Sequence, residues 1–486
     1  WVRPLRAILC LFDGEPIRFR LGEVESADFT FGHRFLAPAR ISVRDFADYE
    51  AKLRRAYVLI DPDERERLIR EQARRLAEAE GLQLAEDPEL LRELRGLVEW
   101  PVVLLGSIDP DFMQLPREVL ITSMRSHQRY LPLLDRDGQL AARFVLVANN
   151  LARDGGQAII AGNERVLRAR LWDARFFWET DRRRPLEARL PELKRVVFHA
   201  RLGSLGEKVE RMIALAGLLA SQVPGADRRR AERAALLAKC DLVTGMVGEF
   251  PELQGIMGGY YARAQGEAEE VARAIAEHYQ PQGPADVCPR APESVVVALA
   301  DRIDTLAGFF AAGITPSGTK DPFALRRAAL GVIRLILENQ LRLALKPLFA
   351  FAVDAYGERF ATVDRHQLAR SLVDFLAERL AVHLRGEGVR YDRIRAVFGV
   401  VEEDDLLRLL ARVRALEAFL AGEDGRDLLV AYRRARNIVA IEERRDGRRY
   451  VGLPTQAAMR EPEEKALSEA LTAAEVMIAE ALQKED

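Results

Sequence analysis

The chain has 486 residues, of which 49% are hydrophobic and 30% charged, and its formal net charge is −2. A single hydrophobic core stops growing at roughly 250–300 residues, so this length predicts a soluble protein of about three domains. The balanced charge excludes a global basic field for nucleic acid, and no stretch is long and apolar enough to span a membrane. Cys10, Cys240 and Cys288 have no paired spacing, which argues against a disulfide framework and predicts a cytoplasmic protein.

Residues 1–185 predict a mixed α/β region. Asp61 precedes a charged helical pattern over residues 61–80 and can serve as its N-cap, with Pro62 in the first turn. A second helix is expected over residues 163–181, with arginines along it. Short runs rich in Val, Leu and Phe predict strands at Leu5–Phe12, Ile17–Leu21, Val102–Leu105, Tyr130–Leu134 and Phe144–Ala148.

Residues 186–486 show almost only helical periodicity, interrupted by clusters of turn residues. Gly386 and Gly388 follow a helix that ends near His383, so we place a boundary there, and a last helix is expected from Glu461 onward. The expected fold class is therefore multidomain α+β, with an N-terminal mixed α/β domain followed by mostly α-helical domains.

The run TPSGTKDPFALRR, residues 315–327, predicts a sharply capped helix with cations around its start. Asp321 stands at the expected N-cap and Pro322 at the first helical position. A buried stripe follows at helical spacing, formed by Leu325, Ala329, Val332, Ile333, Ile336 and Leu337. Lys320, Arg326, Arg327 and Arg334 lie off that stripe, so they are either solvated charges or contacts for an anion.

Residues 239–241 and Asp301 follow the plan of the HD metal-dependent phosphohydrolases, in which a His-Asp pair on one helix is joined by an Asp on a later one. Lys239, Cys240 and Asp241 stand where the His-Asp pair belongs, and the preceding helix over residues 203–220 has no histidine. Metal hydrolases need imidazole ligands and an open position for water, and Lys239 would repel a cation. We therefore expect a vestigial HD site without metal; helix capping or ion pairing is the other role for both aspartates.

A second cationic group lies near the C-terminus of the chain. Tyr432, Arg433, Arg434, Arg436 and Asn437 fall on one predicted helix, with Arg433 and Arg436 on a common side. Arginine and asparagine beside an aromatic ring suit splayed single-stranded RNA bases, whereas a solvated helix face is the alternative. The sequence has no nucleophile elbow, phosphate-binding Gly-Lys-Ser/Thr loop or dinucleotide fingerprint.

Taken together, long runs in a fixed order resemble the β subunit of bacterial tetrameric glycyl-tRNA synthetases. The runs cover nearly the whole chain and include VRPLRAILCLF at Val2, SMRSHQRYLPLLD at Ser123, GNERVLRARLWDARFF at Gly162, LGSLGEKVERM at Leu202, KCDLVTGMVGEFPELQGIMGGYYA at Lys239 and TPSGTKDPFALRRAALGVIRLI at Thr315. The family's chains begin before Val2 and extend beyond Asp486, so we expect this chain to be truncated at both ends.

The resemblance implies a division into three parts. Residues 1–185 would form a mixed α/β body that contacts tRNA, residues 186–345 a degenerate HD-like helical domain, and residues 346–486 a helical linker with an incomplete anticodon-binding domain. Lys320, Arg326 and Arg327 would then contact tRNA, and Arg433, Arg434, Arg436 and Asn437 would contact the anticodon side.

The resemblance also implies a function in which this chain is not the adenylating subunit. It would bind glycine tRNA within an α2β2 heterotetramer, while glycine, ATP and Mg²⁺ bind the α subunit and no cofactor binds here; neither DNA nor a membrane is an expected partner. Two alternatives remain open, a working HD-type metal-dependent phosphohydrolase and a structural RNA-binding adaptor that meets no synthetase.

Overall fold

A computed structural model of the chain describes residues 5, 7–318, 320–386, 388–398, 403–452 and 458–484. The chain divides into two compact units, the first formed by residues 1–389 with 402–408 and the second by residues 390–401 with 409–486. The break after residue 389 coincides with the boundary that Gly386 and Gly388 predict. No helix among the described residues combines the length and apolarity that crossing a membrane requires.

The first unit begins with short strands rather than long ones. A three-stranded sheet has the order β1-β5-β4, and β2 pairs with β3 and β6 with β7 as separate ribbons. The expected strands at residues 5–12 and 17–21 are therefore present only in fragments. The elements are β1 (Ile8–Leu9), β2 (Leu11–Phe12), β3 (Glu15–Pro16), β4 (Arg20–Leu21), β5 (Val24–Ala27), β6 (Phe29–Phe31), β7 (Arg40–Ser42) and α1 (Phe46–Arg55).

A four-stranded antiparallel sheet follows, with the strand order β8-β10-β11-β9. Its strands are β8 (Gln83–Leu84), β9 (Val102–Ser107), β10 (Leu131–Leu134) and β11 (Leu140–Ala148), which confirms three predicted strands. Helices α2 (Pro62–Ala79) and α3 (Pro88–Leu97) pack against this sheet. Ile69 and Leu91 of the helices share one hydrophobic core with Leu131 and Val145 of the strands. The Asp61 side chain accepts a hydrogen bond from the Asp63 N–H, so this N-cap prediction is confirmed.

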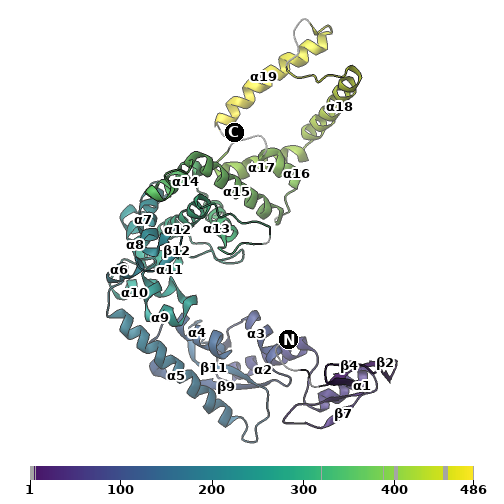
Figure 1. Cartoon of the computed structure of the whole chain (residues 1–486), viewed down its shortest axis with the longest axis vertical. Coiled ribbons are helices and arrows are strands. Elements are labelled where there is room, and N and C mark those ends of the chain that lie inside the picture. Colours follow the sequence, from purple (N-terminus) through teal and green to yellow (C-terminus); the bar gives the residue numbers. More distant parts are fainter. Residues whose placement is uncertain are drawn as a thin grey trace. The chain divides into compact units, whose positions relative to one another are not determined.

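Long helix α5 (Gln157–Arg182) contacts β9 and then leads into the helical part of the unit (Figure 1). Short elements connect these regions: η1 (Pro110–Gln114), α4 (Arg117–Thr122), the π-helical η2 (Ser123–Gln128), η3 (Glu187–Arg189), α6 (Leu190–Leu193), β12 (Val197–His199) and β13 (Gly203–Ser204).

Helix α12 (Pro292–Ala311) is the centre of the helical part, because it is buried along almost its whole length and on all sides. It contacts α7 (Leu205–Leu219), α8 (Arg228–Leu237), α11 (Glu269–Glu277), α13 (Leu325–Glu338), α14 (Leu345–Asp354) and α15 (Arg365–Gly386). Figure 1 shows α7, α8 and α11 near α12. Further short helices are η4 (Cys240–Val243), α9 (Gly245–Glu249), η5 (Pro251–Leu253), α10 (Ile256–Ala264) and η6 (Gly357–Phe360).

The second unit consists of helices in its described residues. They are α16 (Tyr391–Phe398), most of α17 (Leu406–Ala421), α18 (Glu423–Asp446) and α19 (Pro462–Lys484), the last of which confirms the expected terminal helix. The mixed composition of strands and helices confirms the α+β class. The assignment of residues 186–345 and 346–486 to an HD-like and an anticodon-binding domain stays a prediction.

Candidate functional site

The motif at residues 315–327 forms a loop that enters α13, but the helix begins later than predicted. Its N-cap residue is Ala324, in the left-handed conformation with φ of 55°, and its first helical residue is Leu325. The prediction of an N-cap at Asp321 with Pro322 as the first helical residue is therefore wrong. The reason is Phe323, whose ring stacks on Phe309 with 4.5 Å between centroids, so the chain makes an extra turn before the helix starts.

Asp321 still stabilises the start of α13, from outside the helix. Its two carboxylate oxygens accept hydrogen bonds from the backbone N–H groups of Leu325, at 2.8 Å, and Arg326, at 2.9 Å. These are two of the N–H groups that have no partner within a helix. The predicted stripe is confirmed, since Leu325, Ala329, Val332, Ile333 and Ile336 are buried, while Leu337 is half-buried.

The three cations of the motif and Arg334, further into α13, fall into two groups. The Arg326 guanidinium donates to the Gly318 carbonyl at 2.6 Å, and that of Arg334 donates to the carbonyls of Gly283 and Asp286. These two arginines hold loops in place. Lys320 and Arg327 are exposed, and neither side chain bonds to another residue within the described ranges.

The C-terminal cationic group lies on α18 in the second unit. Arg433, Arg434, Arg436 and Asn437 are all exposed, and their side chains make no bond to the residues that the structure describes. Tyr432 precedes them with 59% of its surface exposed. An arginine with no internal partner can pair with a phosphate at little reorganisation cost, so this face is available to an anionic partner.

Lys239 and Asp301, two of the residues predicted for the vestigial HD site, meet in the interior of the first unit. The Lys239 ammonium lies 3.1 Å from Asp301 Oδ2 and 2.8 Å from His278 Nε2, and both lysine and histidine are buried. His278 Nδ1 lies 2.6 Å from the Ile275 carbonyl, which can only accept, so Nδ1 carries the proton and Nε2 accepts from the lysine.

The pKa values of these groups follow from burial and from their neighbours. Burial lowers the pKa of Lys239 to about 8, against the attraction of Asp301. Burial and then Lys239 lower the pKa of His278 to about 3, so the imidazole is neutral at physiological pH. Burial acts to raise the pKa of Asp301, but Lys208 and Lys239 outweigh it and hold that pKa far below its usual range.

Lys239, His278 and Asp301 form one half of a buried charge cluster, and the other half joins α7 to α12. The Lys208 ammonium lies 3.0 Å from Asp301 Oδ1, 3.0 Å from Asp304 Oδ2 and 2.8 Å from Thr305 Oγ1. Arg211 Nε donates to Asp304 Oδ1 at 2.6 Å. Each buried aspartate of the cluster therefore has two cationic partners, which is the ion-pair role open to Asp301.

Asp241 and Cys240 take other structural roles. Asp241 Oδ2 accepts from the backbone N–H groups of Gly255, at 2.5 Å, and Gly258, at 3.1 Å, so it anchors the start of α10. Burial raises the pKa of Asp241 to about 6, although these hydrogen bonds act to lower it. The Cys240 thiol faces the Leu236 carbonyl at 3.7 Å, and burial raises the thiol pKa to about 12.

This donor set does not fit a metal ion. His278 and Asp301 are the kinds of ligand that a metal would use, but the Lys239 ammonium occupies the space between them. No group of three or more His, Cys, Asp or Glu side chains among the described residues could hold a metal. We therefore derive no metal-dependent step from this site.

Sequence reasoning missed four members of the buried cluster: Lys208, Arg211, His278 and Asp304. Lys208 and Arg211 are three residues apart on α7, and Asp301 and Asp304 have the same spacing on α12. Two basic residues at helical spacing on one helix and two acidic residues at the same spacing on another were therefore a usable signal. His278 had none, since only the packing of α11 against α12 brings it to Lys239.

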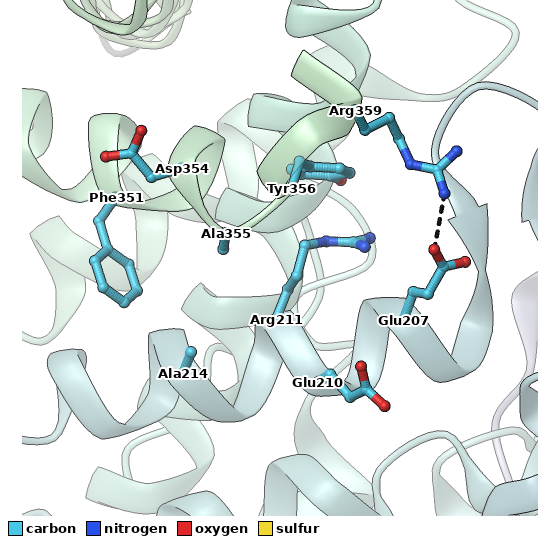
Figure 2. Close-up of a pocket in the computed structure, with 9 residues that line it drawn as sticks. All are labelled: Glu207, Glu210, Arg211, Ala214, Phe351, Asp354, Ala355, Tyr356 and Arg359. Carbon is cyan, nitrogen blue, oxygen red and sulfur yellow. Dashed lines mark hydrogen bonds and ion pairs between the residues drawn. The ribbon is translucent and has the colours of Figure 1, made fainter. Parts of the chain in front are cut away.

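A pocket of about 490 Å³ lies next to the cluster, between α7 and α14, and is shown in Figure 2. The Arg211 guanidinium lies 3.8 Å from the centroid of the Tyr356 ring. Three carboxylates line the pocket, and each has a basic partner: Glu207 pairs with Arg359, Glu210 with Lys194 and Asp354 with Arg365. An acidic lining whose charges are already paired does not favour a phosphate ligand.

Comparisons with known proteins identify the family of the chain. A family model described as the glycyl-tRNA synthetase beta subunit matches residues 1–399. A glycine–tRNA ligase beta subunit from Rhodospirillum centenum is 51% identical over 100% of this chain and 71% of its own length. Those from Phenylobacterium zucineum and a Ruegeria species are 51% and 47% identical, over 100% of this chain and 70% of each relative. The chain therefore belongs to the family of glycyl-tRNA synthetase β subunits.

Proposed function

We propose that this chain binds glycine tRNA and positions it for aminoacylation by a separate α subunit. The observation that carries the proposal is the pair Lys320 and Arg327, two exposed cations without partners among the described residues in a long run typical of the family. Because the net charge of the chain is −2, the protein as a whole does not attract nucleic acid, and exposed cations without internal partners can bind phosphate only where they lie.

The proposal assigns different roles to neighbouring cations. Arg327 and Lys320 contact the tRNA backbone, whereas Arg326 shapes the loop through the Gly318 carbonyl. The exposed group on α18, from Arg433 to Asn437, contacts the anticodon side, where arginine and asparagine can stack on or hydrogen-bond to unpaired bases. The two surfaces lie in different compact units, so a substitution on one surface does not report on the other.

The chemical contribution of the chain is orientation. Holding the 3′ end of a tRNA near an activated amino acid turns a bimolecular step into an intramolecular one, which can lower the barrier by about 7–11 kcal/mol at best. We propose that glycine, ATP and Mg²⁺ bind the α subunit, that the complex is an α2β2 heterotetramer, and that it works in the cytoplasm.

We also propose that residues 186–345 form an HD-like domain in which Lys239 has replaced the metal. The support is the position of the ammonium between His278 and Asp301. Metal analysis of the purified chain tests this: less than one tenth of an equivalent of transition metal is expected, and a stoichiometric metal would favour a hydrolase instead.

The experiment for tRNA binding measures the affinity of glycine tRNA across a salt series. Arg327→Glu and Lys320→Glu should each weaken binding and reduce the slope of log affinity against log salt by about one unit, because each removes a phosphate contact. Arg229→Glu is a matched control, since Arg229 is also exposed in the first turn of a helix, α8, with no bond to a described residue. Equal slopes in all four proteins would refute the assignment.

Aminoacylation tests the role of the chain as a subunit. Glycine tRNA is charged with α alone and with α plus this chain, at equal α concentration. Charging should require the chain, while glycine-dependent ATP–pyrophosphate exchange should proceed with α alone. Pyrophosphate exchange by this chain without α would contradict the division of labour.

A further inference from the structure

A second pocket, of about 350 Å³, opens next to the start of α13. Its floor is formed by α12 at Asp301 and Thr305, one wall by the loop that follows α11, and the opposite wall by the turn before α13. The pocket therefore connects the buried charge cluster with the cationic loop. Its volume lies within the range of small-molecule sites, roughly 300–1,000 Å³.

Four polar side chains on the walls of this pocket are available to a ligand. The carboxamides of Gln254 and Gln282, the hydroxyl of Tyr279 and the guanidinium of Arg327 all line it. None of these four groups makes a hydrogen bond or ion pair with a residue that the structure describes. Because water rather than protein satisfies these groups in the free chain, all four can bond to a polar ligand that enters the pocket without breaking an internal contact.

Aromatic rings complete the walls. The Phe323 ring stacks on Phe309 and retains 39% of its surface, so it can stack on a ligand as well. Tyr279 packs against His278 with 3.9 Å between ring centroids, which fixes its orientation. Burial raises the pKa of Tyr279 well above its ordinary value, so its hydroxyl remains a hydrogen-bond donor.

The pocket is already held in shape. Arg302 donates to the carbonyls of His278, Tyr279 and Pro281, at 2.9, 2.7 and 3.0 Å, and thereby fixes the wall that carries Tyr279. The opposite wall is fixed by Asp321, through its bonds to the first N–H groups of α13. A preformed site binds a ligand without paying to order its own loops.

The charge in the pocket favours an anion. Asp301 is the acidic residue among the lining residues, and Lys208 and Lys239 neutralise it from behind at 3.0 and 3.1 Å. Arg302 and Arg327 add two positive charges to the lining. The pocket of Figure 2 contrasts with it, because its two arginines, Arg211 and Arg359, are already paired with Asp304 and Glu207.

We propose that this pocket binds one unstacked nucleotide, with its base against Phe323 and Tyr279, its polar edge at Gln254 and Gln282, and its phosphate at Arg327. Carboxamides both donate and accept, so they suit base edges, and aromatic rings with arginine are the common partners of splayed nucleotides. The bound nucleotide is either part of an unpaired segment of tRNA or a free mononucleotide. The first of these two sources rests on the proposed function.

The first test titrates the whole chain with the four nucleoside 5′-monophosphates and with inorganic phosphate, by calorimetry. At least one nucleotide should bind more tightly than phosphate. Gln254→Leu should weaken it about three- to tenfold and reduce the preference among bases, because one hydrogen-bonding group is lost. Arg327→Ala should weaken the binding of all four nucleotides to the same extent, because it removes the partner of their common phosphate.

Two matched variants control for indirect effects. Gln367 is an exposed glutamine on α15, and Arg229 is the exposed arginine at the start of α8; neither lines the pocket. Gln367→Leu and Arg229→Ala should leave nucleotide affinity unchanged. The inference is overturned if no nucleotide binds the unmodified chain, or if the pocket variants bind nucleotides as the controls do.

Competition with glycine tRNA distinguishes the two sources. A nucleotide of tRNA is supported if tRNA displaces the mononucleotide. In that case Gln254→Leu should also bind tRNA more weakly, with an unchanged slope of log affinity against log salt. Binding of tRNA without displacement overturns that source and supports a free nucleotide. If tRNA does not bind while mononucleotides do, the proposed function fails and the pocket stands. If only tRNA binds, and Gln254→Leu leaves its affinity unchanged while Arg327→Glu weakens it, the pocket fails and the proposed function stands.

Discussion

Replacing Lys208 by methionine tests whether the buried charge cluster stabilises the helical part of the first unit. Methionine retains most of the aliphatic volume of lysine and removes the ammonium. Lys208 and Arg211 both join α7 to α12, and Lys208 makes more of the contacts: its ammonium contacts Asp301, Asp304 and Thr305 at 2.8–3.1 Å while its side chain is 3% exposed. The variant therefore deletes charge-assisted bonds and leaves the packing nearly intact.

The expected cost follows from what each partner keeps. Breaking a buried ion pair by removing one partner costs about 3–5 kcal/mol. After Lys208→Met, Asp301 still pairs with Lys239 and Asp304 still pairs with Arg211, so neither carboxylate is left alone. We therefore expect the lower end, about 3 kcal/mol. The matched control is Lys194→Met: Lys194 pairs with Glu210 at 3.2 Å with both side chains more than 60% exposed, so it should cost less than about 1 kcal/mol.

The assay is native-state hydrogen exchange of the amides of α7 and α12 at low urea concentrations. A local measurement is needed because a chain with two compact units does not unfold in one two-state step. A loss of about 3 kcal/mol corresponds to roughly 100-fold faster exchange in Lys208→Met, with little change in Lys194→Met. If both variants exchange at the same rate, the buried cluster adds no net stability and the reasoning is wrong.

Three further outcomes follow from single contacts. Asp321→Ala should destabilise α13 by about 1 kcal/mol, seen as faster exchange of its first-turn amides, because two backbone N–H groups lose their acceptor. Gly331→Ala should lower the thermal midpoint, at a cost of about 1–3 kcal/mol, since the new methyl group would overlap the buried Arg302 side chain. His278 should stay neutral from pH 5 to 8 in its NMR shifts. The pKa of His278 is about 3 in the folded chain and 6.5 in the unfolded chain, so the unfolded chain takes up a proton first as pH falls. The stability that the neutral imidazole contributes is therefore present above pH 6.5 and lost as pH falls toward 3. His278→Gln should remove this pH-dependent loss of folding stability, and a variant with the same dependence of stability on pH would count against the assignment.

Local patterns predicted the elements that depend on neighbouring residues in sequence. The Asp61 cap, the strands predicted at 102–105, 130–134 and 144–148, and the buried stripe of α13 all follow from side chains within one helix turn or one strand. The start of α13 was predicted three residues too early, because the stacking of Phe323 on Phe309 is a contact across the fold that no local pattern contains.

The sequence by itself determined the family, the α+β class and the cationic character of residues 315–327. Only the tertiary structure decided which cations of this region have no internal partner among the described residues. Arg326 is held by a carbonyl eight residues away, and Arg334, beyond the motif, by carbonyls about fifty residues away. Likewise, only the tertiary structure brought His278 and Lys208 next to Lys239 and Asp301 of the predicted vestigial HD site. The physical reason is that a buried charge needs partners from several helices, and packing rather than sequence spacing brings those partners together.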